Sequence, residues 1–525
     1  MTPQSAIAQL TFEELDDVEY WRRLCLLQAD AGELENALTA CEQGLALEPK
    51  DADLWALHSD VLLRQMSYPD AIASADQALA FDPENSLALA TQCTAFFELE
   101  QTEMALDLCN DALRLNGSWG DRAPSIAWRQ RGQLLNQQGD FDQALTAYDR
   151  TLLLEPEDSL TLVYRCEALV NLAQYREAIA SCEDALVGNG HWGDESPALA
   201  WHLQGVAHTQ LEQYFLAIAA YDQAVNLAPD NFKTWTEQGQ VLDILERPEE
   251  SLTSYTQAVA LKPDHSRALV GQCGLFNQLA QYEAALAACE QAIAGDGEWG
   301  QEGAAQAWSQ KSIALAGGGQ FEASLAAANR AVGIHPTYPE AWNNRGAVLW
   351  YMERYDEALA STNRAIALDP TYARPWATQG TIRRAMTHYD LALEAYERSL
   401  QLNPDASEVW ANRSLVLWHL EDYDTAVLSA NRAINLTPNL FQGWFNRAAA
   451  LVALNRYDEA LDSYEQAVEL APSNADAWTG LGVVLVELEQ FDQAMLALQQ
   501  ALSLNAEQPL AIAVMEVLAE YESSN

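Results

Sequence analysis

The chain has 525 residues, of which 49% are hydrophobic, and its 28 basic against 76 acidic residues give a net charge of -48. A surface this negative repels phosphate backbones and anionic lipid headgroups, which argues against nucleic acid as a partner. No apolar run approaches the roughly 20 residues needed to cross a bilayer, and the first residues lack a basic head followed by an apolar segment. We therefore expect a cytoplasmic protein without direct membrane insertion.

After an N-terminal lead at residues 1–17, a repeat of about 34 residues runs along the chain. Ten of the thirteen steps between repeats are 34 residues long, and three are 39. We therefore predict repeats 1–8, with three insertions, over residues 18–304, and repeats 9–14, with regular spacing, over residues 305–506. The fourteen repeats begin at residues 18, 52, 86, 125, 159, 198, 232, 266, 305, 339, 373, 407, 441 and 475.

Apolar and small residues recur at fixed positions of the repeat. Position 4 is Trp in eleven repeats and Leu in three, position 8 is small, position 20 is Ala or Ser, and position 32 is Pro in ten repeats. Positions 4, 8 and 11 share one face of a first helix, and positions 20, 24 and 27 share one face of a second. Such a hairpin has one apolar face, which it can bury only by stacking on its neighbours.

This pattern of Trp, small residue, Ala and Pro resembles the tetratricopeptide repeat family over residues 18–506. The resemblance implies an all-α fold, a right-handed α-α superhelix of fourteen helical hairpins, with a concave groove that binds peptides or partner proteins. Residues 507–525 are predicted to form a C-terminal capping helix and tail, because the apolar residues Leu510, Val514 and Val517 recur there at helical spacing.

Each of the three longer steps contains a Gly-Trp-Gly insertion, as in NGSWGDRAPS at 116–125. Position 32 is Gly there instead of Pro, so the insertions are expected to lie between repeats. Glycine on both sides of the Trp permits a left-handed turn that returns the ring to the array. The preferred interpretation is a structural loop whose Trp (Trp119, Trp192 or Trp299) fills a gap between hairpins. The alternative is a contact surface along one edge.

All eight cysteines form pairs spaced by 16 residues, at positions 8 and 24 of one repeat. We favour reduced, buried cysteines without a reactive role, since no Cys-x-x-Cys motif is present. A redox-responsive crosslink within each hairpin remains the alternative. Three of these repeats precede a Gly-Trp-Gly insertion and have Leu at position 4. The pairs are Cys25 and Cys41, Cys93 and Cys109, Cys166 and Cys182, and Cys273 and Cys289.

The sequence contains no recognisable catalytic motif. Gly317, Gly318 and Gly319 fall at the turn between two predicted helices, with no preceding strand and no following Lys-Ser/Thr. His202 and His208 lie six residues apart, which does not suit shared metal ligation on one helix. We therefore predict a protein that is not an enzyme and that needs no metal or cofactor.

The negative charge is unevenly distributed, which points to a candidate binding region. Residues 301–450 carry 15 acidic and 12 basic residues, whereas residues 451–525 carry 13 and 1. In the tetratricopeptide repeat family, positions 2, 5, 6, 9, 12 and 13 line the groove. Amides at these positions can satisfy a peptide backbone, aromatic rings offer flat contact area, and Arg can bind a carboxylate. The predicted partner-binding residues are Asn343, Asn344, Trp350, Tyr351, Arg374, Arg384, Asn412, Trp418, His419 and Asn446.

These features predict a non-catalytic scaffold or adaptor that holds an extended segment of a protein partner, with basic partners attracted to the negative surface. An alternative for Trp350 and Trp418 is that they seal neighbouring hairpins. Two other functions stay open: a substrate-recruiting arm for a separately encoded enzyme, and an architectural spacer. The four lysines, many glutamines and tandem repeats are typical of a bacterial protein.

Overall fold

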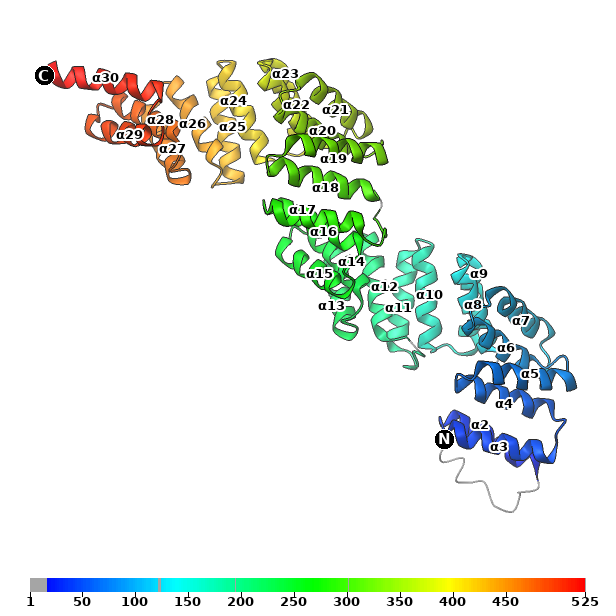
Figure 1. The fold of residues 1–525 in the computed structure, drawn as a ribbon. Coiled ribbons are helices and arrows are strands. Elements are labelled where there is room, and N and C mark those ends of the chain that lie inside the picture. Colours follow the sequence, from blue (N-terminus) through cyan, green and yellow to red (C-terminus); the bar gives the residue numbers. More distant parts are fainter. Residues whose placement is uncertain (1–16, 121–123, 194, 301, 525) are drawn as a thin grey trace. The chain divides into compact units, whose positions relative to one another are not determined.

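The computed structural model describes residues 17–120, 124–193, 195–300 and 302–524, and side-chain burial as far as residue 519. The predicted lead at residues 1–17 lies outside this range except for its last residue. Within the described residues the protein is all-helical, with 29 helices, α2 to α30, joined in pairs as fourteen hairpins and a final helix (Figure 1). The all-α hairpin fold predicted from the sequence is confirmed.

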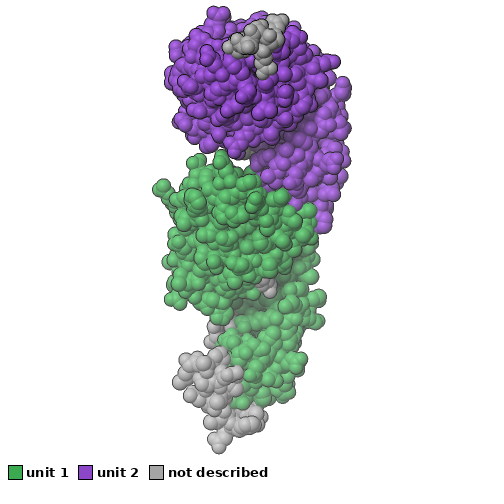
Figure 2. Space-filling view, turned by 90° about the vertical axis from the view of Figure 1, so that its left-hand side faces the viewer, with its two compact units in different colours: residues 1–261 green, residues 262–525 purple. Residues whose placement is uncertain are grey.

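Two compact units divide the chain, residues 1–261 and residues 262–525 (Figure 2). The first unit contains α2 Val18–Asp30, α3 Leu34–Leu47, α4 Ala52–Arg64, α5 Tyr68–Phe81, α6 Ser86–Glu98, α7 Thr102–Leu115, α8 Ser125–Gln137, α9 Phe141–Leu154, α10 Ser159–Asn171, α11 Tyr175–Val187, α12 Pro197–Gln210, α13 Tyr214–Leu227, α14 Phe232–Ile244 and α15 Pro248–Leu261.

The second unit continues the same alternation of first and second helices. It contains α16 Ser266–Gln278, α17 Tyr282–Ala294, α18 Ala304–Gly317, α19 Phe321–Ile334, α20 Pro339–Tyr351, α21 Tyr355–Leu368, α22 Ala373–Ala385, α23 Tyr389–Leu402, α24 Ser407–His419, α25 Tyr423–Leu436, α26 Phe441–Ala453, α27 Tyr457–Leu470, α28 Ala475–Glu487, α29 Phe491–Leu504 and α30 Pro509–Ser524. None of the described helices is both long and apolar enough to span a bilayer.

The turn inside every hairpin uses a left-handed residue at position 15. Glycine occupies this position in three repeats, as at Gly319 with a φ of 74°. Elsewhere other residues adopt the same conformation, as Glu353 does with a φ of 58°. Because non-glycine residues enter this region only at a cost, the tertiary packing of the two helices imposes the turn. The triplet Gly317–Gly319 therefore ends α18 and forms a hairpin turn, as predicted.

Positions 8 and 24 of a repeat face each other and share a limited volume. A Cβ atom built on Gly380 would lie 2.7 Å from the ring of Tyr396, and one built on Gly132 would lie 2.4 Å from the ring of Tyr148. Both tyrosine side chains are fully buried. In these repeats the Tyr ring at position 24 therefore occupies the space beside the Gly at position 8, because a packed interior leaves little room for both side chains.

Position 4 links successive repeats through the Trp indole. In repeats that follow a Pro at position 32, the Trp Nε1 donates a hydrogen bond to the carbonyl of that Pro, as Trp410 does to Pro404 at 2.8 Å. The same bond recurs at Trp55, Trp235, Trp342, Trp376, Trp444 and Trp478. The Trp thus holds the first helix of its repeat against the end of the preceding hairpin.

The three Gly-Trp-Gly insertions lie between helices, as predicted, and fold back onto their own repeat. Gly117, Gly190 and Gly297 each donate their backbone N–H to the hydroxyl of the Ser that begins the first helix of that repeat. Trp119 packs against the cluster that contains Leu89, and Trp192 packs against the cluster that contains Leu162. The insertion therefore brings an aromatic ring to the repeat that has Leu at position 4, as the structural-loop interpretation expects.

All eight cysteines are paired in four disulfides, each between positions 8 and 24 of one hairpin. The preferred prediction of reduced cysteines is therefore wrong, although every Cys side chain is buried as expected. The two helices bring the Cα atoms of each pair to 5.3–5.5 Å, which is within the usual range for a disulfide. Sequence spacing alone could not supply this distance.

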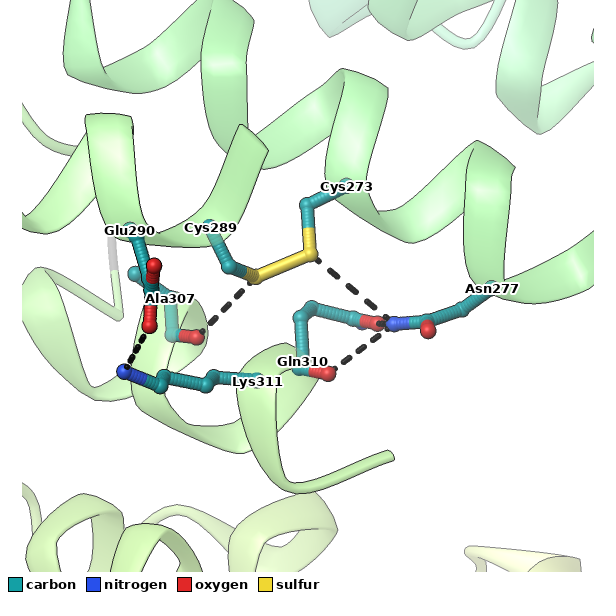
Figure 3. Close-up of a disulfide and its surroundings, with 7 residues drawn as sticks. All are labelled: Cys273, Asn277, Cys289, Glu290, Ala307, Gln310 and Lys311. Atoms are coloured by element: carbon teal, nitrogen blue, oxygen red, sulfur yellow. Dashed lines mark hydrogen bonds and ion pairs between the residues drawn. A yellow bond between two sulfur atoms is a disulfide. The ribbon is translucent and has the colours of Figure 1, made fainter. Parts of the chain in front are cut away.

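Figure 3 shows the disulfide Cys273–Cys289 and its neighbours on α16, α17 and α18. The Sγ of Cys289 lies 3.3 Å from the carbonyl oxygen of Ala307, on the first helix of the next repeat. Asn277 donates to the side-chain oxygen of Gln310 at 3.0 Å. The crosslink therefore sits at the interface between two hairpins, where it orders both the hairpin and its neighbour.

The final helix, α30, caps the array on one side only. Ala511 and Leu518 are buried in the cluster that also holds α26 to α29. Leu510 and Val517 are 54% and 63% exposed. The helix therefore covers the last hairpin as predicted, while its opposite side still presents apolar residues.

Candidate binding groove

The first helices of repeats 9–13 pack side by side in the C-terminal unit. In chain order α18, α20, α22, α24 and α26 each contact the next. Their positions 9, 12 and 13 point away from the hairpin interface formed by positions 4, 8 and 11. Two hollows open between these helices, one at each end of the row, and five of the ten predicted partner-binding residues line them.

The first hollow lies between α18 and α20 and has a volume of about 280 Å³. Asn344 and Tyr351 line it from α20, while Ile313 and Gly317 line it from α18. Asn344 donates to the hydroxyl of Ser309 at 2.9 Å, which leaves its side-chain oxygen available. An apolar floor with one amide at its wall suits a peptide side chain and its backbone.

The second hollow lies between α24 and α26 and has a volume of about 270 Å³. Its apolar wall comes from Leu415, Trp418, Phe445 and Ala449. His419 and Asn446 complete the lining, and the amide of Asn446 donates to the backbone carbonyl of Ala411 at 2.8 Å. The hollow is therefore an apolar cup whose one amide is held in place by the preceding repeat.

Aromatic side chains at position 13 stack on the second helix of the preceding repeat. His419 stacks on Tyr389 with ring centroids 4.5 Å apart, and Tyr351 stacks on Phe321 at 5.3 Å. Burial lowers the pKa of His419, and the charge of Arg384 lowers it further. These rings form flat surfaces beside the hollows, which can contact a ligand with little loss of conformational freedom.

The two tryptophans of the predicted site have different surroundings. Trp350 is half-buried and packs against the cluster of Leu349 and Ile382. Trp418 is 37% exposed and lines the second hollow. Trp350 therefore fits the alternative in which it seals neighbouring hairpins, whereas the ring of Trp418 is open to a ligand.

Arg384 lies between the two hollows, near the end of α22. Its guanidinium hydrogen-bonds the hydroxyl of Tyr396, whose pKa is raised chiefly by burial and lowered by this contact. Its Nε is buried and has no acceptor. Among the residues that the structure describes, no carboxylate forms an ion pair with Arg384, in contrast to Arg413, which pairs with Glu397 at 2.8 Å.

Of the remaining predicted residues, two are at least partly exposed and one, Asn343, is buried. Asn343 is only 6% exposed and accepts a hydrogen bond from Thr378 at 3.0 Å, so its side chain joins two repeats and does not face a ligand. Arg374 is exposed, and Asn412 is half-buried on α24. Position 5 therefore belongs to the interface between repeats here, whereas position 6 borders the groove.

Some residues that line the hollows were not among the predicted ones. Tyr282, at position 17, lies outside the expected groove positions and lines the first hollow from α17. Leu415 lines the second hollow from position 9, which is an expected groove position. Most repeats have an aromatic residue at position 17, as at Phe321 and Tyr389. That recurrence is the signal that could have identified Tyr282, because position 17 supports the ring at position 13 of the next repeat.

One group of residues has the composition of a metal site, but it already holds a cation. The groups His265, Asp296 and Glu298 lie close together beside the third insertion. The Nζ of Lys262 is 2.7 Å from the carboxylate of Asp296. Burial raises the pKa of Asp296, but hydrogen bonds from Lys262, His265 and two backbone N–H groups outweigh it and hold that pKa well below the usual range. The cluster therefore anchors the insertion.

Comparison with known proteins identifies the repeats. One model of the "Tetratricopeptide repeat" matches residues 5–86, 91–159, 236–302 and 378–440, which is more than half of the chain. Other models of this repeat match further stretches, at residues 198–231, 339–372, 449–488 and 475–508. The models describe repeats, and none of them describes an enzyme.

Among curated relatives, the chain is 25% identical over 115 residues to tetratricopeptide repeat protein 33 of Xenopus laevis, covering 22% of this chain and 43% of that protein. It is 23% identical over 184 residues to the mitochondrial import receptor subunit TOM70 of Homo sapiens, covering 35% of this chain and 30% of that protein. The chain therefore spans less than half the length of either relative.

Similar solved structures include the APC/C hetero-tetramer Cut9-Hcn1, with a TM-score of 0.48 and 16% identity over 98% of both chains. YrrB, a TPR protein with an unusual peptide-binding site, matches with a TM-score of 0.32 and 23% identity, over 37% of this chain and 99% of that one. The family models, together with the fourteen hairpins, show that this chain belongs to the tetratricopeptide repeat family.

Proposed function

We propose that this protein is a non-catalytic scaffold or adaptor that holds an extended segment of a partner protein along the first helices of repeats 9–13. The observation that carries this proposal is the second hollow, an apolar cup lined by Trp418 and Phe445. Exposed aromatic rings in a hollow are typical anchors of protein interfaces. The first hollow, with Asn344 and Tyr351, supplies a second contact along the same row of helices.

Family membership supports protein binding in general, and the groove assignment rests on the geometry of these hollows. The negative charge outside residues 301–450 favours long-range attraction of basic partners, which salt weakens. A neutral groove within an acidic chain can accept a segment that the rest of the surface does not attract. The groove and the outer surface therefore select different parts of a partner.

Site-specific photocrosslinking in the native cell tests the proposal. A benzoylphenylalanine residue replaces Ile313 in the first hollow or Ala449 in the second. The control replaces Gln466, which lines a separate hollow between α25, α26 and α27. We expect protein adducts from the two groove positions and few from the control. Adducts from Gln466 alone would place partner binding elsewhere and contradict the proposal.

The same experiment separates the two alternative functions. A separately encoded enzyme found in the adducts at a one-to-one ratio would indicate a substrate-recruiting arm. An architectural spacer predicts that Asn344→Ala, Arg384→Ala and Asn412→Ala together leave every adduct unchanged. A scaffold with the proposed groove predicts that this triple variant loses the adducts at Ala449, while its helical content stays constant.

A further inference from the structure

We infer that the segment bound in this groove is acidic, with a carboxylate that pairs with Arg384 and with a bulky apolar side chain on each side of it. This inference rests on the proposed function and adds the chemistry of the partner. It departs from the expectation of a basic partner, because net charge describes the whole surface and not the groove. Three observations on the described residues support it.

The first observation is that Arg384 carries an unused hydrogen-bonding capacity. Its Nε is buried and has no acceptor, and no carboxylate of the described chain pairs with it. Buried donors are nearly always satisfied in folded proteins. The chain has 76 acidic residues, so carboxylates are abundant. None of those in the described residues is positioned to pair with Arg384. Because Nε is enclosed, a carboxylate from outside would pair with the terminal nitrogens of the guanidinium, for which no ion pair is found among the described residues.

The second observation is the type of residue at position 12. In the neighbouring repeats this position holds Trp350, Trp418 and Val452, all apolar. Arg384 is therefore a cation at a position that is apolar in the repeats on either side of it, although this position is polar in four of repeats 1–8, as at Asp243 and Asn277. Its location in the last turn of α22 favours a positive charge, but that effect does not account for the missing acceptor at Nε.

The third observation is the surroundings of Arg384. The ring of His419 lies near enough to Arg384 to be affected by its charge, and it lines the second hollow together with Trp418. The Arg384 side chain is half-buried. A carboxylate bound here would be partly shielded from water, where its bond to a guanidinium is stronger than at an open surface.

The order of the helices sets the spacing of the three contacts. The first hollow lies between α18 and α20, Arg384 lies on α22, and the second hollow lies between α24 and α26. Packed helices are about 8–10 Å apart, and an extended chain advances about 3.3–3.6 Å per residue. The carboxylate should therefore lie about four residues from each apolar side chain, so the two apolar residues are about eight apart.

Phage-displayed random 12-residue peptides, selected on the full-length protein, test the inference. We expect the enriched peptides to carry Asp or Glu about midway between two bulky apolar residues. Selection on Arg384→Gln should lose the acidic preference, and the synthetic acidic peptide should bind this variant about tenfold more weakly. The control is Arg432→Gln, which removes an exposed arginine on α25 that pairs with Asp405, in the turn between α23 and α24.

Each outcome decides one of the two proposals. Enriched peptides without an acidic residue, or an acidic preference that survives Arg384→Gln, would overturn the inference and leave the groove intact. Ala449→Trp fills the second hollow. If the same peptides are enriched on this variant, the second hollow does not bind them, and the proposed function is refuted. Equal thermal unfolding of the variants and the wild type shows that the losses are local.

A second inference comes from the disulfides: we infer that the chain matures in an oxidising compartment. All eight cysteines are paired, and all are buried at the same two positions of four repeats. Structural disulfides of this kind persist in oxidising compartments and are rare where thiol reductants are abundant. This inference replaces the expectation of a cytoplasmic protein.

Formation of the four disulfides requires an oxidant of defined class. Each pair of thiols loses two protons and two electrons, and a disulfide-bonded thiol oxidoreductase accepts the electrons by thiol–disulfide exchange and becomes a dithiol. Exchange must take place before the hairpins close, because the sulfur atoms are fully buried in the folded chain. A compartment that supplies such oxidoreductases during folding is therefore needed.

Thiol counting on protein from its native source tests this inference. Cells are quenched in acid, and the chain is denatured and treated with iodoacetamide before its intact mass is measured. We expect no carbamidomethyl groups without reductant and eight with it, one for each Cys. Eight groups without reductant would show a reduced chain and overturn the inference. Labelling of all four cysteine pairs in a fraction of the molecules would overturn it as well.

Discussion

Two kinds of repeat in this chain hold their hairpins together in different ways. The insertion repeats, at residues 86–124, 159–197 and 266–304, have Leu at position 4, a disulfide between positions 8 and 24, and a Trp in the following loop. The uninterrupted repeats, at residues 305–506, have Trp at position 4 and no cysteine. In all of the latter except the first, which follows an insertion, the Trp indole bonds the Pro carbonyl of the preceding hairpin.

In two of the insertion repeats, an aromatic ring reaches the cluster around position 4 from the insertion and not from position 4 itself. In repeat 3 the ring of Trp119, from the end of the repeat, packs against the cluster that contains Leu89. In repeat 5 the ring of Trp192 packs against the cluster that contains Leu162. Gly at position 32 leaves these repeats without the Pro that bonds the Trp of the next repeat, and the insertion's own backbone bonds instead tie it to the first helix of its own repeat.

The largest expected effect concerns the disulfides. Replacing Cys93 and Cys109 together by Ala should lower the stability of that hairpin by about 3 kcal/mol, since the bond closes a loop of about 16 residues. Hydrogen exchange of α6 and α7 measures the loss. In the uninterrupted repeat 12, Ser414→Ala at the same position 8 should cost only about 1 kcal/mol, because it removes one hydrogen bond to Ala426.

Equal exchange of α6 and α7 in the double variant and the oxidised wild type would contradict this prediction. Reduction of the wild type with dithiothreitol should reproduce the loss in the four disulfide-containing hairpins and leave α20 to α29 unchanged. This pattern would separate the two kinds of repeat in one experiment.

The second prediction concerns the uninterrupted repeats. Gly380→Ala should destabilise repeat 11 by about 1–3 kcal/mol, because the new Cβ would lie 2.7 Å from the buried ring of Tyr396. Chemical denaturation monitored at α22 and α23 measures the change. Gly333→Ala is the matched control, since it lies inside α19 with no atom near the new Cβ, and it should stabilise that helix by up to about 1 kcal/mol.

If Gly380→Ala is neutral, or if Gly333→Ala is equally harmful, positions 8 and 24 do not share the limited volume described above. Replacing Tyr396 by Ala in the same chain should relieve the overlap and make Gly380→Ala harmless. The insertion repeats avoid the conflict because two Cys residues occupy these positions.

The third prediction tests the aromatic ring in the insertions. Trp192→Ala should lower the protection of α10 and α11 by about 1–2 kcal/mol, which is less than for a fully buried Trp, because the ring is half-buried. Trp192→Phe keeps an aromatic ring and should lose less. Hydrogen exchange of both variants checks the order. An unchanged α10 in Trp192→Ala would favour the contact-surface interpretation of the insertion.

The smallest expected effect is the pH dependence of the third insertion. The folded-state pKa of Asp296 is lowered, so the stability it adds is complete above the pKa of an unfolded Asp, about 3.9, and is lost as the pH falls through the lower folded value. Exchange of the Ser266 and Glu298 amides between pH 6 and pH 2 should show a loss below about 1 kcal/mol, because the site is near the surface.

Asp296→Asn should remove this pH dependence while the first two insertions behave as in the wild type. A third insertion whose protection is constant down to pH 2 in the wild type would show that Lys262 and His265 do not hold the carboxylate in solution.

The sequence predicted the hairpins well because the signals involved are local. The period of 34 residues, the helical spacing of positions 4, 8 and 11, and the Pro or Gly at position 32 act within one repeat. They place the insertions between α7 and α8, α11 and α12, and α17 and α18, where the structure has them. The left-handed turn at Glu353 was not predictable from residue type, because only the packing of two helices imposes it.

The candidate site was predicted less completely. An angle of 100° per residue on an ideal helix does not separate neighbouring positions, so Asn343 was grouped with Asn344. In the structure Thr378 of the next repeat buries Asn343, while Asn344 borders a hollow. Tyr282 was missed because it belongs to a second helix, whose contribution to the groove depends on how one hairpin leans on the next.

The sequence by itself determined the number of hairpins, their boundaries and the acidic surface with its neutral stretch. Only the tertiary structure decided that positions 8 and 24 lie close enough for Cys273 and Cys289 to bond, that Trp192 packs against the cluster of Leu162, and that the Nε of Arg384 has no acceptor among the described residues. The physical reason is distance along the chain. Helix formation depends on residues within one turn, whereas these contacts join residues 16 or more apart, whose separation only the packed helices define.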